Sequence, residues 1–250
     1  MSEPTIVALL YHHVGPVREE TCKGLTVLPQ AFSRQIATLS AMGYRAVLPD
    51  DWVACIRGQG EIPDRSVMIT FDDAYADLAE FALPVLEKHG YPATVFVPTS
   101  LVGGELRCNP RQPGPRLAIM SREQISKWSN RGVTFGSHSR THTDLLSISI
   151  EQAQEEIASS KLALEEIVEH PVTAFAYPYG KFDSDVERIV GSNYSAAFTT
   201  EQGINDSSTP LTRLKRTMVQ HKDTVADVLL RARYGKSVLD KVRSMVAPRA

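Results

Sequence analysis

The sequence predicts an α/β protein built as a parallel (β/α) barrel. Short apolar segments alternate with helical patterns along the 250 residues, which is typical of strands joined by helices in such a barrel. The apolar segments lack regular polar alternation, as expected for strands buried on both faces. A chain of this length fits one barrel, so we expect a single domain over residues 1–250 with its core at about 5–235.

Eight apolar segments are the candidate strands. They cover residues 6–11, 44–48, 67–71, 94–97, 133–136, 173–177, 196–199 and 215–219. In a (β/α) barrel the functional side chains lie at the C-terminal ends of the strands. Asp72, Asp73, His138 and Tyr179 all follow directly on predicted strands, which indicates one common site.

Helical segments lie between these strands and carry recognisable end signals. They cover residues 29–42, 77–89, 121–130, 149–169 and 223–234. Pro29 begins the first of them, and Pro84 is expected to kink the second or to mark its true start. Ser121 and Ser149 each open a capping box, and Asp223 is expected to cap the last helix.

Two adjacent acids and two histidines supply the parts of a metal-assisted hydrolase. Asp72 and Asp73 end an apolar run, and His138 and His142 stand four residues apart. One carboxylate and two imidazoles can hold a divalent ion, which leaves the second carboxylate to work as a base. Each pattern alone is more often a solvated turn or an ordinary histidine. Their combination at strand ends favours a metal site.

Three motifs resemble those of a known family. They are Thr70-Phe71-Asp72-Asp73, His138-Ser139-x-x-His142 and Tyr177-Pro178-Tyr179-Gly180. In order and spacing they resemble the first three motifs of the NodB-homology polysaccharide deacetylases, carbohydrate esterase family four. The likeness runs from about residue 6 to residue 219. It implies a distorted barrel of seven β/α units rather than eight.

Residue chemistry and this resemblance assign the same roles. One divalent ion would be bound by Asp73, His138 and His142. Zinc is the expected ion, with cobalt, nickel or iron as alternatives. Asp72 would take a proton from the attacking water. The backbone N–H of Tyr179 would stabilise the oxyanion, because Pro178 has no N–H to donate.

A general acid is also needed, and its usual motif is missing. Most of the family carries a Leu-x-His motif near the C-terminus, which this chain lacks. The candidates are His12, at the end of the first predicted strand, and His221. We favour His12, because its position resembles the biofilm poly-N-acetylglucosamine deacetylases, in which this element is permuted to the N-terminus. His13 should point the other way.

A second departure concerns the third motif. Most of the family has an arginine two residues before the Pro-Tyr-Gly, where it orients the base carboxylate. This chain has Ala176 at that place. Arg213 or Arg216 is a candidate to replace it by pairing with Asp72, and an ordinary surface arginine is the alternative.

Several residues near the proposed site are candidates for binding the substrate. Tyr75 and Tyr179 are expected to stack on a sugar ring, and Pro178 and Arg216 to contact the substrate as well. Trp128 lies on a predicted helix and is expected in the core. Residues 103–117, rich in Gly, Pro and Arg, are expected at the rim, where they either shape the groove or form an ordinary surface loop.

Charge and composition exclude several partners. A formal charge of −2 and a pI near 6.4 give no general attraction to nucleic acid or to an anionic membrane. The apolar run at 6–10 is too short to span a bilayer, and the first residues do not resemble a signal peptide. We therefore expect the chain to be cytoplasmic as it stands, and exported if a leader has been removed.

The cysteines and the C-terminal tail have no assigned function. Cys22, Cys55 and Cys108 show no Cys-x-x-Cys spacing, and their odd number argues against a disulfide framework. Residues 236–250 are weakly patterned and basic, and we expect a solvated terminal segment.

The leading hypothesis is a metal-dependent hydrolase that removes N-acetyl groups from an N-acetylhexosamine polysaccharide or glycan and releases acetate. One alternative is the same chemistry on a small or lipid-linked amide, as in a deformylase or a cyclic-amide hydrolase. Another is a metal-free carbohydrate-binding pseudoenzyme, which the presence of both acids and both histidines disfavours.

Overall fold

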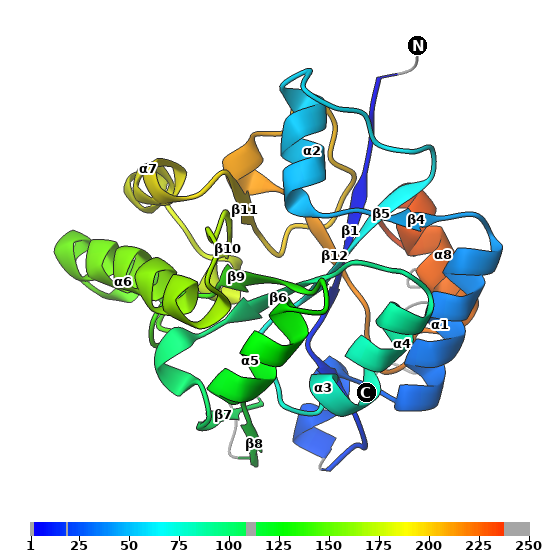
Figure 1. Ribbon diagram of the computed structural model, residues 1–250, viewed down its shortest axis with the longest axis horizontal. Helices are drawn as coiled ribbons and strands as arrows, with labels where there is room; N and C mark the ends of the chain where they lie inside the picture. The colour runs from blue at the N-terminus through cyan, green and yellow to red at the C-terminus, as the bar shows by residue number, and fades with distance from the viewer. Residues whose placement is uncertain (1–2, 19, 109–113, 238–250) are drawn as a thin grey trace, which may run out of the picture.

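A ring of parallel strands forms the centre of the molecule (Figure 1). The structure is a computed structural model that describes residues 3–18, 20–108 and 114–237. The strands follow one another in the order β12 (Arg216–Met218), β1 (Val7–Tyr11), β5 (Ser66–Phe71), β6 (Thr94–Val97), β9 (Thr134–Ser137), β10 (Ala174–Ala176) and β11 (Ala196–Phe198). Leu214, just before β12, bridges Phe198 in β11 and joins the two ends of this order. The expected distorted barrel of seven units is confirmed.

The eighth predicted strand lies outside this ring. Residues 44–48 form only the short strand β4 (Arg45–Ala46), which pairs with the start of β5. It ends early because Leu48 is already the N-cap of helix α2 (Pro49–Ile56), and proline is favoured in the first turn of a helix. Helix α2 was not predicted from the sequence.

The strands are apolar because both of their faces are covered. All residues of β1 and β5 are buried, and their parallel register runs from Val7 opposite Val67 to Tyr11 opposite Phe71. One apolar cluster fills the space between the strands and the helices. A smaller cluster that includes Ala8, Met68, Phe96 and Phe198 packs separately from it.

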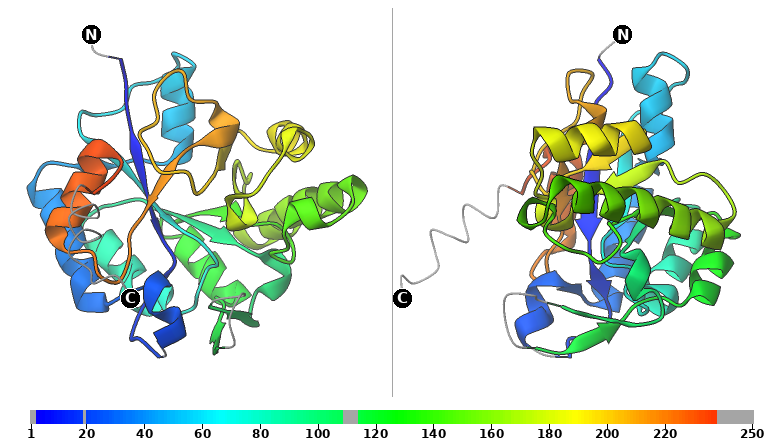
Figure 2. Two further views of the ribbon diagram at one scale, coloured as in Figure 1. Left: turned by 180° about the vertical axis from the view of Figure 1, so that it is seen from behind. Right: turned by 90° about the vertical axis from the view of Figure 1, so that its left-hand side faces the viewer.

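Helices surround the ring (Figures 1 and 2). They are α1 (Pro29–Ala41), α3 (Leu78–Phe81), α4 (Leu83–Lys88), α5 (Arg122–Ser129), α6 (Ile150–Val168), α7 (Ser184–Asn193) and α8 (Val225–Tyr234). The capping boxes at Ser121 and Ser149 are confirmed, and the predicted interruption near Pro84 is the break between α3 and α4 at Ala82. Helix α7 was not predicted.

The cap of the last helix was wrongly predicted. Thr224, not Asp223, caps α8, and its hydroxyl accepts a hydrogen bond from the backbone N–H of Asp227. The carboxylate of Asp223 instead accepts two hydrogen bonds from the buried Arg231 guanidinium at 2.9 and 3.1 Å. A buried charge requires such a partner, and this requirement takes Asp223 away from the helix end.

A disulfide joins two segments at one end of the barrel, which corrects the expectation from the odd cysteine count. Cys22 lies in the 3-10 segment η1 (Glu20–Leu25), and Cys108 follows strand β7 (Glu105–Arg107). Their Cα atoms are 5.5 Å apart across 86 residues of sequence. Figures 1 and 2 show η1 and the β7–β8 hairpin at the same end of the molecule. Cys55 is free and half-buried.

Two predicted segments fall partly outside the described residues. The rim segment at 103–117 is an antiparallel hairpin of β7 and β8 (Arg116–Ala118) rather than an ordinary loop, and residues 109–113 lie outside the described part. Of the tail at 236–250, residues 238–250 lie outside it as well. Among the described residues, no helix combines the length and apolar character needed to cross a membrane.

Candidate active site

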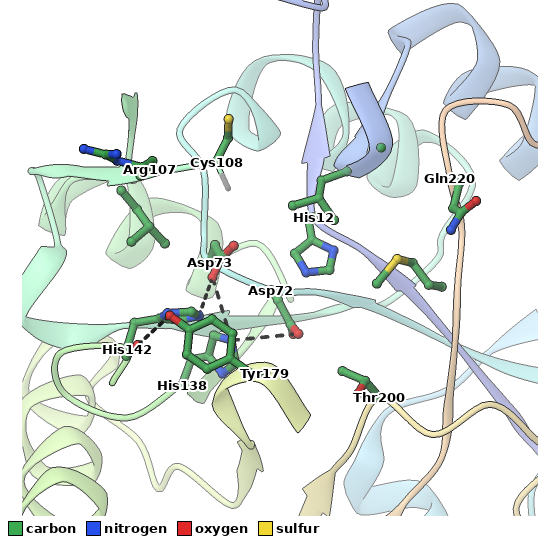
Figure 3. Close-up of a pocket in the computed structure, with 14 residues that line it drawn as sticks. His12, Asp72, Asp73, Arg107, Cys108, His138, His142, Tyr179, Thr200 and Gln220 are labelled. Atoms are coloured by element: carbon green, nitrogen blue, oxygen red, sulfur yellow. Dashed lines mark hydrogen bonds and ion pairs between the residues drawn. The ribbon is translucent and has the colours of Figure 1, made fainter. Parts of the chain in front are cut away.

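A cavity of about 510 Å³ opens at the C-terminal ends of the ring strands (Figure 3). Its floor follows β1, β5, β9 and β10, the strand ends at which the sequence motifs stand. The residues that line it are His12, Gly24, Leu25, Asp72, Asp73, Leu106, Arg107, Cys108, His138, His142, Tyr179, Thr200, Met218 and Gln220. Six of them were predicted from the sequence as site residues: His12, Asp72, Asp73, His138, His142 and Tyr179.

The three expected metal ligands converge in this cavity. One ligand atom from each of Asp73, His138 and His142 lies within 4.8 Å of the others. Nε2 of His142 is 3.1 Å from Oδ1 of Asp73, and Nε2 of His138 is 3.7 Å from the same oxygen. Nδ1–H of His138 donates to the Ala176 carbonyl at 2.7 Å. This bond fixes the tautomer, so the Nε2 lone pair of His138 faces the site.

Two features of the site suit a divalent ion: a buried carboxylate oxygen that lacks hydrogen-bond donors, and the types of donor atom. Oδ1 of Asp73 is buried, and apart from the His142 ring at 3.1 Å it has no hydrogen-bond partner among the described residues. A buried carboxylate oxygen in that state needs a positive partner. Two imidazole nitrogens and one carboxylate oxygen form a set that zinc accepts, with positions left open. Asp73, Ala74 and His142 also adopt left-handed backbone conformations, with φ of 70°, 50° and 60°, which are frequent at functional sites.

The electrostatic setting makes the two histidines differ. Burial lowers the pKa of His138 to about 4, so its ring is neutral and can act as a ligand. Burial alone would also lower the pKa of His142, but the adjacent Asp73 carboxylate outweighs it and raises that pKa above its usual value. Burial likewise opposes ionisation of Asp73, yet His142 holds the pKa of Asp73 well below its usual range.

Asp72 is separated from the ligand set by a partner of its own. Nη1 and Nη2 of Arg216 donate to the two carboxylate oxygens of Asp72 at 2.6 and 2.8 Å. Burial would raise the pKa of Asp72, but the guanidinium outweighs it and keeps that pKa below its usual value. Arg216 is itself fully buried, and Nε donates to the Thr199 carbonyl at 2.9 Å. The pair therefore lies under the cavity with a fixed bidentate geometry.

The choice between the two arginines is thereby resolved in favour of Arg216. Arg213 lies at the surface and pairs with Glu187, with Nε donating at 2.7 Å. Its guanidinium also lies over the Phe182 ring, 5.5 Å from the centroid. Arg216, at the start of β12, is thus the arginine that pairs with Asp72, although it lies in another part of the chain than Ala176.

His12, His13 and His221 lie in different surroundings. Figure 3 shows the His12 ring inside the cavity, pointing toward Asp72 and Asp73. His13 points away as expected, and its ring contacts Asp77 at 2.7 Å and Thr26 at 3.1 Å. His221 donates to the Thr26 carbonyl at 3.1 Å and lines a different hollow.

The structure places one of the four expected substrate-binding residues at the cavity and the other three outside its lining. Tyr75 is buried, bridges Ile119 and does not line the cavity; burial, with the Asp73 charge, raises its pKa. Pro178 is buried in the turn, and Arg216 is fully buried against Asp72. Tyr179 lines the cavity, with its ring 4.9 Å from that of His142 and its hydroxyl donating to the His142 carbonyl at 3.4 Å. Trp128 is in the core, as expected.

Several cavity residues carried no motif in the sequence. Gly24 and Leu25 come from η1, and Leu106 and Arg107 come from the β7–β8 hairpin. Thr200, Met218 and Gln220 follow or end the last two ring strands. Only the composition of residues 103–117 pointed toward the rim, and no local signal in the sequence marked η1.

Comparison with known proteins decides the family. A polysaccharide deacetylase family model matches residues 59–194, which is more than half of the chain. The chain belongs to the polysaccharide deacetylase family. The matched region contains all three motifs. His12 and Arg216, the candidates to replace the missing Leu-x-His histidine and the missing arginine of the third motif, lie outside it.

Relatives and solved structures agree with this family. The chain is 26% identical over 196 residues to the putative polysaccharide deacetylase YxkH of Bacillus subtilis, covering 78% of this chain and 64% of that protein. It is 27% identical over 207 residues to a poly-β-1,6-N-acetyl-D-glucosamine N-deacetylase of Staphylococcus epidermidis, covering 75% and 69%. This confirms the resemblance to the biofilm subgroup. The structure of the Streptococcus pyogenes deacetylase PplD in complex with acetate matches with a TM-score of 0.81 and 26% identity, covering 92% of this chain and 99% of that one.

Proposed function

We propose that this chain is a metal-dependent deacetylase that hydrolyses N-acetyl groups of an N-acetylhexosamine polysaccharide and releases acetate. The observation that carries the proposal is the convergence of three ligand atoms beside a separate, ionised carboxylate at the floor of an open cavity. The Staphylococcus epidermidis relative is named for this reaction on poly-β-1,6-N-acetyl-D-glucosamine. The PplD structure contains acetate, which deacetylation of an N-acetyl group would release.

Asp73, His138 and His142 would hold the ion, with zinc as our first choice and cobalt, nickel or iron as alternatives. A divalent ion in such a site polarises an amide carbonyl and makes water acidic enough to attack at neutral pH. Asp72 would accept the proton of the attacking water. Its bidentate pairing with Arg216 supports this role in two ways, because it keeps the carboxylate ionised and fixes its direction.

The remaining steps fall to His12 and Tyr179. As the water oxygen bonds to the carbonyl carbon, negative charge grows on the carbonyl oxygen, and the backbone N–H of Tyr179 would stabilise it. The C–N bond then breaks, and His12 would give a proton to the leaving amine nitrogen. The products are acetate and a free amine on the sugar. The place of His12, across the cavity from the two ligand histidines, supports this assignment.

The disulfide bears on where the chain works. Disulfides form and persist in oxidising compartments and are rare in the cytosol. The Cys22–Cys108 bond joins two segments that line the cavity. We therefore favour the exported alternative over the cytoplasmic one, which also agrees with an extracellular glycan as substrate.

Acetate release from poly-β-1,6-N-acetylglucosamine oligomers tests the proposal, with a panel of small N-acetyl and N-formyl amides assayed beside them. We expect zinc-dependent release from the oligomers that a chelator abolishes and that added zinc restores. Release from the small amides alone would replace the glycan by a small substrate. Oligomer binding without any acetate release, with zinc present, would contradict an enzyme altogether.

A further inference from the structure

The loop between the two histidine ligands is held by a carboxylate from helix α6. Oε2 of Glu156 accepts hydrogen bonds from the backbone N–H of Arg140 at 3.0 Å and of Thr141 at 2.8 Å. Oε1 accepts the hydroxyl of Thr141 at 2.9 Å. Glu156 is only 8% exposed, so water does not readily replace these bonds. One side chain thus binds two successive peptide groups in the centre of the His138–His142 motif.

The backbone conformation of this loop needs support from outside the loop. Ser139 and His142 both have φ near 60°, a conformation that costs non-glycine residues energy and persists only where the surroundings enforce it. The N–H of His142 donates to the Ser139 hydroxyl at 3.1 Å, which is a bond within the loop itself. Anchors from outside are therefore what fix the loop against the barrel.

Residues outside the loop form hydrogen bonds with both its carbonyl groups and its N–H groups. The N–H groups of Thr99 and Ser100 donate to the carbonyls of Ser139 and Arg140 at 3.2 and 2.8 Å, which satisfies the acceptors. Glu156 satisfies the donors. Loss of Glu156 would leave two peptide N–H groups without these partners directly before His142, and the loop would then gain alternatives to its present conformation.

We propose that Glu156 is a positioning residue of the metal site, which fixes His142 relative to Asp73 and His138 through the backbone of the intervening loop. The inference rests on the proposed function, because it needs an ion at these three residues. Glu156 forms hydrogen bonds to the loop and not to the ligand side chains. Partners behind metal ligands commonly control affinity, with losses of about 10- to 100-fold when they are removed.

A glutamine at this position separates positioning from charge. Its carbonyl oxygen can accept from both peptide N–H groups, and its amide nitrogen can donate to the Thr141 hydroxyl oxygen, so every bond has a counterpart. If Glu156 acts by holding the loop, Glu156→Gln keeps zinc affinity near that of the wild type. If it acts by its negative charge near the ion, glutamine loses as much as alanine.

Helix α6 provides a matched control. Glu165 lies on the same helix, and its Oε1 accepts the backbone N–H of Val172 at 2.9 Å. That peptide precedes strand β10 rather than the histidine loop. Glu165→Ala therefore removes a comparable carboxylate-to-backbone bond without touching the metal site.

The test is the zinc dissociation constant, measured by competition with a chelating dye, together with the melting temperature in the absence of zinc. We expect the dissociation constant to rise about 10- to 100-fold in Glu156→Ala, and to change less than threefold in Glu156→Gln and in Glu165→Ala. Zinc affinity in Glu156→Ala equal to that of the wild type, or Glu156→Gln as weak as Glu156→Ala, would overturn the inference. A wild type that binds no zinc would instead overturn the proposed function.

Discussion

The floor and one wall of the cavity are built in different ways. The floor consists of Asp72, Asp73 and His138, which follow directly on ring strands, and of His142, which lies in the loop after β9. All four are at most about one-tenth exposed. The wall consists of Gly24, Leu25 and the residues 106–108, which belong to segments that leave the barrel. The Cys22–Cys108 disulfide connects the two parts of this wall.

The difference indicates that the floor carries out the chemistry and that the wall contributes to substrate binding. Side chains at the ends of buried strands are fixed by the sheet, as chemistry requires, because small displacements cost large factors in rate. Segments outside the barrel can change in length and composition without disturbing it. We therefore expect floor substitutions to change kcat or metal binding, and wall substitutions to change KM.

The largest effect is expected for Asp72→Asn on the floor. This variant should keep its zinc and lose kcat by about 10²- to 10⁴-fold, the usual contribution of a general base. It also leaves the buried Arg216 without its charged partner, so assays should be run well below the measured melting temperature. Acetate release and zinc content are measured together, beside Asp73→Asn. Zinc lost from Asp72→Asn but kept by Asp73→Asn would mean that the two acids have exchanged roles.

A smaller effect on kcat is expected for His12→Ala. Because the cavity is open, water can reach the leaving nitrogen and replace part of the lost acid, so we expect a loss of about 100-fold, near the lower end for general acid catalysis. His221→Ala is the matched control, since His221 lies in a different hollow. Both variants are compared at saturating zinc. A silent His12→Ala beside a damaging His221→Ala would return the general acid to the C-terminal part of the chain.

The smallest effect on the chemical step is expected for the wall. Replacing both Cys22 and Cys108 by serine should raise KM for oligomers several-fold and leave kcat within about twofold. The free energy of unfolding should fall by about 2–5 kcal/mol, the usual cost of removing a native disulfide. Cys55→Ser controls for the loss of a thiol and should change neither KM nor the free energy of unfolding. A double variant with normal KM but reduced kcat would show that the wall affects the chemical step and not substrate binding.

The floor could be predicted from the sequence because its residues are neighbours in the chain as well as in space. Asp72 and Asp73 are adjacent, and His138 and His142 are separated by one turn of loop. A parallel barrel brings the ends of all its strands to one face. Local motifs and this general rule of the fold were therefore sufficient to predict which residues form the floor.

The wall could not be predicted because its contacts are long-range. Cys22 and Cys108 are 86 residues apart, and nothing in the sequence places η1 beside the β7–β8 hairpin. The sequence also did not reveal which side chains near the site are buried. Tyr75 stands two residues from Asp73, but its side chain is buried, and its backbone forms an isolated β-bridge with Ile119. Arg216 was recognised as a partner of Asp72 only as one of two alternatives.

We propose that Asp73, His138 and His142 bind one divalent ion, and that Asp72 stays paired with Arg216 and is not a ligand. Crystals grown with zinc and measured at wavelengths above and below the zinc absorption edge test this most directly. We predict one strong anomalous peak per chain, in contact with one carboxylate oxygen of Asp73 and with Nε2 of each histidine, and not with Asp72. A peak bound through Asp72, a peak elsewhere in the chain, or no peak in excess zinc would rule out this metal site.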